Sequence, residues 1–397
     1  MLDDNTLPLV PAGDRRKDPQ PYAYFLEELK GKLFWEAMDT NCSQFLYLVL
    51  ERRKPEVTQM IFSEVKDQIC ILMSDRCGSN VVEKLYEVCN EQQMDQLVFS
   101  ITANVDLLMA VCLHSRGSKS MKKFLQCLVT PDQISHMISI FLGITVPLVN
   151  HEIGVGVIRH CLHIFPAKQT QILDVIADNL FEIATWKTGC LLLGDVLGSK
   201  VYPLESQQRI VSEIIANVHR LCVTRYGCHV ARDVLCFKIQ DGVRDIVARL
   251  TGTFASLSMN THASDLVLSL IEKYKEECAP QIINEIICSS DFSRLLLHPD
   301  GKDVLEHAKK YSKGAVLKSL NHQIALHSDH SRSPRHGENN PPKSQGTVHK
   351  IMNHQVPLHS DQVHSHCHGK NIMPKSQGTG QQILNQQIPD TLTIGLQ

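Results

Sequence analysis

One stretch of this 397-residue chain holds side chains whose types and spacing could grip the edge of a ligand. Ser79 and Glu83 stand four residues apart in the run GSNVVEKL, residues 78–85, and Asn80 directly follows the serine. On a helix, a spacing of four places two side chains on one face, one turn apart. A hydroxyl donates and accepts hydrogen bonds, whereas a carboxylate only accepts them. The pair can therefore bind one polar edge, provided that this stretch is helical.

The same arrangement of residues recurs along the chain. Each copy has a small residue, a residue equivalent to Ser79, one intervening residue, two apolar residues and a residue equivalent to Glu83. We call the equivalents of Ser79 and Glu83 the first and second pair residues. The spacing between copies averages 37 residues. The small residues of the eight copies are Cys42, Gly78, Gly117, Gly154, Gly189, Gly227, Ala263 and Gly301. Self-similarity at a fixed period is the signature of a repeat architecture. The sequence therefore predicts eight equivalent structural units.

Three positions of each copy carry its side-chain chemistry. The first pair residue directly follows the small residue, and the copies have Ser43, Ser79, Ser118, Val155, Cys190, Cys228, Ser264 and Lys302 there. The second pair residue lies four positions later, at Tyr47, Glu83, Lys122, Arg159, Gly194, Arg232, Leu268 and Glu306. The intervening residue directly follows the first pair residue, at Gln44, Asn80, Lys119, Gly156, Leu191, His229, Asp265 and Asp303.

These positions need helices to hold them, and residues 23–320 read as helix almost throughout. Apolar residues recur there at spacings of three and four, which predicts amphipathic helices. Thr130 followed by Pro131 reads as a helix start, and Pro166 is expected to open another helix. A unit of about 37 residues cannot bury its apolar face alone, so stacked copies should form a solenoid with one continuous core and a concave face.

The small residue and the apolar pair have expected packing roles. A glycine at the small position permits close approach between the start of one helix and the neighbouring repeat. The two apolar residues should face the core shared by adjacent repeats, and only the third copy departs, with Ser120-Met121. Another α-solenoid, of HEAT or armadillo repeats, is the structural alternative.

Copies such as GSNVVEKL (78–85), RYGCHVARDVL (225–235) and HASDLVLSLIE (262–272) resemble the second-helix motif of the Pumilio (PUF) family. The resemblance covers residues 23–320, about three quarters of the chain, and the number of copies agrees with the family. It implies an all-α, right-handed solenoid of eight repeats that forms a curved arc.

The resemblance also implies a function. PUF proteins read single-stranded RNA with one base per repeat, through two or three side chains each. Ser79 and Glu83 resemble the family's guanine-reading pair, and RNA runs antiparallel to the repeats, so that guanine would lie toward the 3′ end of the site. The candidate base-edge residues are Ser43, Tyr47, Ser79, Glu83, Ser118, Lys122, Arg159, Cys190, Cys228, Arg232, Ser264 and Glu306. The candidate stacking or backbone residues are Gln44, Asn80, Lys119 and His229.

Only the second copy keeps a complete pair. Basic residues such as Lys122 and Arg159 would attract phosphate without reading sequence. The resemblance implies binding of mRNA 3′ untranslated regions and regulation of translation or stability, in the cytoplasm. The alternatives are a protein-interaction solenoid and a structural RNA binder without sequence specificity, the latter of the nucleolar sort. Protein partners could also bind the convex face.

Composition narrows these alternatives. Forty basic and 42 acidic residues give a formal net charge of −2, which excludes a polybasic nucleic-acid binder and makes local charge decisive. The 14 cysteines include no CxxC pair and lie in apolar stretches, which favours reduced, buried thiols. The first residues show no signal peptide, and the longest stretch without charged residues, Gln133 to His151, reads as soluble helix.

The ends of the chain differ from its centre. Residues 1–22 are expected to be a flexible leader, and residues 321–397 a disordered His- and Gln-rich tail that duplicates itself with a period of 32 residues. His364–His368 (HSHCH) contains metal-binding side chain types but reads as part of that tail. No nucleotide-binding loop, HExxH or nucleophile elbow is present, so no catalytic residue, cofactor or metal is predicted.

Overall fold

The computed structural model describes residues 20–236 and 242–329. The chain divides into two units, residues 1–334 and 335–397, and every described residue lies in the first. The secondary structure of the described residues is helical, without a strand.

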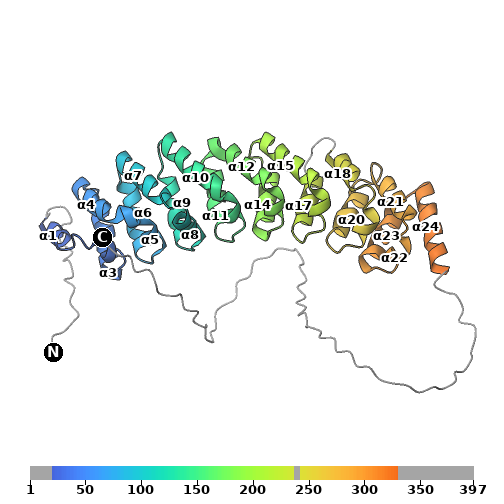
Figure 1. The fold of residues 1–397 in the computed structure, drawn as a ribbon, viewed down its shortest axis with the longest axis horizontal. Coiled ribbons are helices and arrows are strands. Elements are labelled where there is room, and N and C mark those ends of the chain that lie inside the picture. Colours follow the sequence, from blue (N-terminus) through green and yellow to red (C-terminus); the bar gives the residue numbers. More distant parts are fainter. Residues whose placement is uncertain (1–19, 237–241, 330–397) are drawn as a thin grey trace, which may run out of the picture. The chain divides into compact units, whose positions relative to one another are not determined.

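Each repeat contains a first helix and a motif helix that carries the pair residues, and every repeat but the fourth has a short middle helix between them (Figure 1). The motif helices are α3 (Thr40–Glu51), α6 (Gly78–Val88), α9 (Gly117–Gln126), α11 (Val155–Ile164), α14 (Lys187–Gly198), α17 (Gly227–Asp233), α20 (Ser264–Lys273) and α23 (Pro299–Tyr311). The first helices are α1 (Gln20–Glu28), α4 (Pro55–Val65), α7 (Glu91–Thr102), α10 (Pro131–Val149), α12 (Gln169–Asp178), α15 (Leu204–Ala216), α18 (Gly242–Leu250) and α21 (Ala279–Cys288).

The middle helices are α2 (Leu33–Glu36), α5 (Ile69–Ser74), α8 (Val105–Leu113), α13 (Leu180–Ala184), α16 (Val218–Leu221), α19 (Phe254–Ser258) and α22 (Phe292–Leu295). The fourth repeat has no separate middle helix, because α10 continues through that region to Val149. Three short 3₁₀ helices, η1 (Lys66–Gln68), η2 (Pro166–Lys168) and η3 (Val234–Cys236), and the terminal helix α24 (Gly314–Asp329) complete the described elements.

The motif helices form one continuous layer. Each of them, from α3 to α23, contacts the next one along the chain. The two apolar residues of the motif are buried in every copy except at Phe45, which is half-buried, and even Ser120 of the third copy is fully buried. One hydrophobic core runs from Leu26 to Leu320. The predicted all-α solenoid of eight repeats is therefore confirmed.

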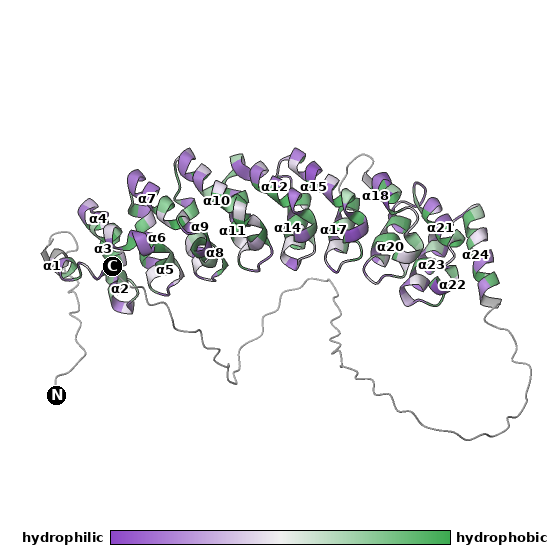
Figure 2. Cartoon of the chain, in the orientation of Figure 1, coloured by the Kyte–Doolittle hydropathy of each residue, from purple (hydrophilic) through white to green (hydrophobic). Residues whose placement is uncertain are grey.

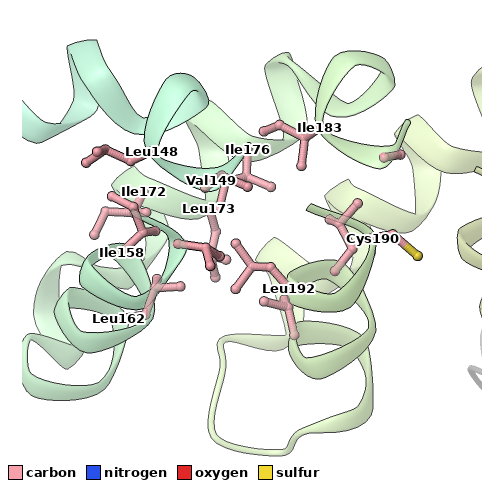
Figure 3. Close-up of a cluster of buried hydrophobic side chains, with 14 of the residues drawn as sticks. Leu148, Val149, Ile158, Leu162, Ile172, Leu173, Ile176, Ile183, Cys190 and Leu192 are labelled. Atoms are coloured by element: carbon pink, nitrogen blue, oxygen red, sulfur yellow. The ribbon is translucent and has the colours of Figure 1, made fainter. Parts of the chain in front are cut away.

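Figure 3 shows how two repeats share this core. Side chains from α10 and α11 meet side chains from α12 and α14, and they include Leu148, Ile158, Leu162, Ile172, Leu173 and Leu192. Each of these side chains is fully buried. Figure 2 shows hydrophilic residues over much of the first helices, whereas hydrophobic residues lie where the helices of neighbouring repeats pack together.

A side-chain cap fixes the start of most motif helices. The residue three positions before the small residue accepts hydrogen bonds from backbone N–H groups of the first turn, as Asp75 Oδ1 does from Cys77 and Gly78 at 2.8 and 2.7 Å. Such caps satisfy N–H groups that have no partner within the helix. The acceptors are Asp39, Asp75, His114, His151, Thr224 and Asn260.

Glycine is needed at the small position mainly because of contacts within the same repeat. A Cβ atom on Gly154 would lie 2.7 Å from the carbonyl oxygen of Leu148 and 2.9 Å from Leu113 of the preceding repeat. A Cβ on Gly301 would lie 2.6 Å from the carbonyl oxygen of Leu295. The expected close approach to the neighbouring repeat is therefore the less severe contact. The shortest distance is to the backbone carbonyl oxygen six residues earlier in the same repeat.

Helix α10 is long, and it begins where the sequence predicts a helix start. Thr130 and Gln133 form a reciprocal capping box, and Pro131 occupies the first turn, as the sequence predicts. This helix is long and apolar enough to cross a membrane by composition, but it is a core helix here, with Phe141 and Leu148 fully buried. Each cysteine within residues 20–236 and 242–329 is a free thiol.

The expected tail boundary at residue 321 is wrong by nine residues. Helix α24 continues to Asp329, with Leu320 buried and Ile324 packed on the core. His327 contacts Ser293 Oγ at 2.9 Å, and its ring lies 5.5 Å from that of Phe292. The first helix likewise begins at residue 20, inside the expected leader of residues 1–22.

The residues beyond position 321 are compatible with a continued helix. The segment NHQIALHSD (321–329) returns as NHQVPLHSD (353–361), and the alanine at 325 is replaced by proline in that copy. Proline inside a helix removes a hydrogen bond and clashes with the preceding turn, whereas alanine favours helix. The rest of the predicted tail, residues 330–397, lies outside the described residues.

We predict that Gly154→Ala lowers the free energy of unfolding by about 1–3 kcal/mol, because the new methyl group would press on the Leu148 carbonyl. Gly143→Ala is the matched control, since nothing lies within 4 Å of a Cβ there. Alanine should stabilise α10 at that site by up to about 1 kcal/mol. Urea denaturation of both variants measures the difference, and equal stabilities would contradict the role given to Gly154.

Candidate nucleic-acid interface

The pair positions have a constant environment from repeat to repeat. The first pair residue is buried in repeats one to seven, the second pair residue is half-buried wherever it has a side chain, and the intervening residue is exposed apart from Gly156. The eighth repeat departs, because Lys302 and Glu306 are both exposed. We call the surface of the motif helices at and directly around these three positions the motif face. The structure thus brings the sequence-predicted site residues to equivalent places on consecutive helices.

The first pair residues are anchored to their own helices. Ser43 Oγ and Ser118 Oγ donate to the carbonyl oxygens of Thr40 and Ser115, at 3.2 Å each. Cys228 Sγ donates to the carbonyl of Arg225 at 3.3 Å. Burial raises the pKa of the Cys190 thiol to about 11, so this residue stays neutral at physiological pH. Figure 3 shows its sulfur directed away from the labelled core side chains.

The intact pair lies on α6. Ser79 is buried, Glu83 is half-buried and Asn80 is exposed. Burial raises the pKa of Glu83 above the ordinary glutamate value, and the nearby ammonium of Lys123 partly offsets this rise. The α6 helix therefore presents a hydroxyl and a partly desolvated carboxylate beside positive charge from the next repeat.

A lysine cluster surrounds this pair. Glu87 Oε1 and Oε2 accept hydrogen bonds at 2.8 Å from Lys123 and Lys84, respectively, and these bonds lower the pKa of Glu87 to about 2. The ammonium of Lys84 also lies 4.8 Å from the ring centre of Tyr47, a cation–π contact to the first repeat. Lys119 and Lys122 of α9 take part in no ion pair with any described residue.

The two arginines predicted as base-edge residues are engaged by the next repeat. Arg159 of α11 forms an ion pair with Asp195 of α14. Arg232 Nη1 of α17 lies 3.9 Å from Asp265 Oδ2 of α20, and Arg232 Nη2 lies 3.2 Å from Nδ1 of His229. Both guanidinium groups therefore meet a carboxylate on the motif face itself.

Repeat five offers little to a polar ligand. Gly194 has no side chain, and Leu191 is an exposed hydrophobic residue. A Cβ on Gly194 would lie 3.6 Å from Oδ2 of Asp233, so a carboxylate of the sixth repeat borders this position. Burial raises the pKa of that carboxyl group above its ordinary value. Val155 and Leu268, in repeats four and seven, likewise provide no side-chain hydrogen bond.

Sequence reasoning missed the residue that follows the second pair position. Lys84, Lys123, His160 and Asp195 occupy it in consecutive repeats, and each contacts the preceding repeat. A search for opposite charges at this position and at the second pair position one repeat earlier would have found Asp195. Within the described ranges no cluster of three metal-binding side chains exists, and residues 364–368 lie outside them.

Comparisons with curated proteins point to one group of relatives. The chain is 30% identical over 321 residues to Pumilio homolog 12 of Arabidopsis thaliana, which covers 80% of this chain and 54% of that protein. It is 28% identical over 305 residues to Pumilio homolog 11 of the same plant, covering 77% of this chain and 54% of that protein. The chain thus spans about half the length of these relatives.

Solved structures share the fold. The PUM-HD domain of S. pombe Puf1 in complex with RNA matches with a TM-score of 0.64 at 19% identity, covering 75% of this chain and 81% of that one. The Puf4 RNA-binding domain bound to a 3′ UTR recognition sequence matches with a TM-score of 0.57 at 23% identity, covering 75% and 93%. No family model matches the chain.

Proposed function

The chain belongs to the Pumilio family, and on that premise we propose that it binds single-stranded RNA from mRNA 3′ untranslated regions and regulates translation or stability. This is a binding role, with no catalytic residue. The observation that carries it is the Ser79–Glu83 pair, which stands in register with seven equivalent sites on consecutive packed helices.

The chemistry of the intact pair favours guanine. The guanine ring edge carries two N–H donors, at N1 and N2, and the Glu83 carboxylate accepts from both, whereas Asn80 is exposed and placed to stack on the base. The amide donors of one edge need two acceptor atoms side by side, which a carboxylate provides. The base that faces the second repeat is therefore the best defined of the site.

Phosphate attraction belongs mainly to the third repeat. Lys119 is exposed and Lys122 half-buried on α9, next to the intact pair. Their charges are available to the RNA backbone, which supports binding without sequence preference. Repeats two and three together thus combine one base reader with adjacent backbone contacts.

A protein-interaction role is the second candidate function. Trp186 and Leu191 of repeat five are each 55% exposed, although apolar side chains of this size favour burial. Exposed apolar residues suit a protein surface better than a phosphate backbone. Partners could also occupy the face of the first helices. We place the proposed action in the cytoplasm, where translation and decay of mRNA occur, with the nucleus or nucleolus as the alternative.

We predict that Glu83→Gln relaxes the guanine preference by roughly 1–3 kcal/mol, by analogy with bidentate base contacts. The amide nitrogen of glutamine would oppose one guanine donor. Glu306→Gln is the control, since Glu306 is exposed in a repeat that has Lys302 in place of serine. Fluorescence anisotropy with RNA pairs that differ at one base measures the preference. If wild type shows no guanine preference and Glu83→Gln changes nothing, the interaction solenoid becomes the better hypothesis.

The guanine preference should also depend on pH. Only the ionised carboxylate accepts both guanine donors, and burial raises the Glu83 pKa. The preference is therefore complete at neutral pH and declines as the pH falls through that raised pKa, above the ordinary value of about 4.3. The same titration of Glu83→Gln should give a flat, weak preference. A wild-type preference that persists unchanged to pH 4 would exclude Glu83 as the acceptor.

We predict that Lys122→Ala weakens binding of all RNAs about equally and flattens the dependence of affinity on salt concentration by about 0.7 per lost phosphate contact. Lys168→Ala, in η2 and outside the motif helices, is the control. Affinities at two or more salt concentrations provide the slope. A loss confined to one base position would instead make Lys122 a base reader.

A further inference from the structure

Two ion pairs on the motif face have the same construction. In each, an arginine at the second pair position meets an aspartate of the next motif helix, as Arg159 meets Asp195 and Arg232 meets Asp265. The side chains of Arg159 and Asp195 are 40% and 55% exposed, and those of Arg232 and Asp265 are 38% and 57% exposed. The arginines and aspartates are therefore accessible to a ligand on this face.

The acidic residues gather on one part of the motif face. Asp195, Asp233 and Asp265 lie on α14, α17 and α20, which are consecutive motif helices. The lysines Lys119 and Lys122 lie on α9, where no described carboxylate pairs with them. The face thus has a basic part at repeat three and an acidic part at repeats five to seven.

We propose that Asp195 and Asp265 compete with RNA phosphates for Arg159 and Arg232, and so confine firm RNA contact to repeats two and three. This inference rests on the proposed function, because it concerns the same face and the same ligand. The aspartates act through the arginines, whose charge they neutralise. They limit the length of RNA that the solenoid grips.

The aspartate and an RNA phosphate are comparable partners for the arginine, so their competition affects RNA affinity. Exposed ion pairs contribute little to stability, so a phosphate can exchange with the aspartate at small cost. The aspartate remains, however, and competes for the same guanidinium, and this competition is reduced by salt. A guanidinium that is already neutralised locally releases no counterion when RNA arrives. The two arginines therefore contribute less to affinity than their number of charges implies.

The test compares variants that change the net charge equally at two places in the solenoid. Asp195→Asn and Asp265→Asn each free one arginine on the motif face. Asp174→Asn is the matched control, since Asp174 pairs with Arg209 between the first helices α12 and α15 and removes the same charge. Binding of a guanine-containing RNA of about eight nucleotides and of a uridine homopolymer is measured over a range of salt concentrations, together with thermal stability.

We expect Asp195→Asn to bind both RNAs roughly three- to tenfold more tightly at low salt and to steepen the salt slope by about 0.7, the value for one further phosphate contact on a single strand. The control should leave affinity and slope unchanged. The double variant Arg159→Ala with Asp195→Asn should lose the gain, because it removes the freed guanidinium. A gain that survives in the double variant would show a general charge effect and overturn the proposal.

Other outcomes separate this inference from the proposed function. If wild type binds RNA with a guanine preference and Asp195→Asn binds no better, the competition is refuted and RNA binding stands. If Asp195→Asn binds more weakly than wild type at unchanged stability, the aspartate positions Arg159 for RNA, which is the opposite of the proposal. If neither wild type nor any variant binds RNA at low salt, the proposed function fails and this inference fails with it.

Discussion

The stacking of incomplete units is the constraint on which the rest of the structure depends. A repeat of about 37 residues buries its apolar face only against its neighbours. Each motif helix therefore packs against the next, and glycine at its start lets it approach the preceding helix closely. Because the apolar pair is committed to the shared core, the residues around it have fixed directions. In most repeats the first pair residue is therefore buried, the second pair residue is half-buried and the intervening residue is exposed.

Because the repeats are regular, side chains of the motif face can bind a ligand, but they can also bind side chains of the next repeat. Side chains on adjacent motif helices lie close enough to contact one another, as Glu87 and Lys123 or Arg159 and Asp195 do. A charged residue that serves a ligand can thus be satisfied by the protein instead. Whether a position is available to RNA depends on its neighbour in the next repeat as much as on its own side chain. Lys122 and Arg159, both basic at the same position, differ in this respect.

The sequence predicts the fold well because the fold is repetitive. Eight copies in register fix the helices, the apolar pair and the order of the units, and a single copy would not have done so. It predicts the contacts between copies poorly, since Asp195 and Asp265 stand 36 and 33 residues from their arginines, and the motif pairs neither aspartate with an arginine. The caps of the motif helices were not predicted from the sequence, and His114 and His151 are the hardest to foresee, because histidine is not among the usual cap residues. The end of α24 was missed because residues 321–329 belong to a polar, duplicated segment.

The scale of base recognition limits what the motif face can do alone. One complete pair provides roughly 1–3 kcal/mol of discrimination, which corresponds to about a 5- to 150-fold preference. A single guanine occurs in nearly every messenger RNA, so such a preference cannot select one transcript from many. Selection in the proposed role therefore requires a second source of specificity. The exposed apolar residues Trp186 and Leu191 belong to repeat five, where Gly194 leaves Cys190 without a second pair side chain. A protein partner bound there would add specificity at the place where the RNA-reading face has least to offer.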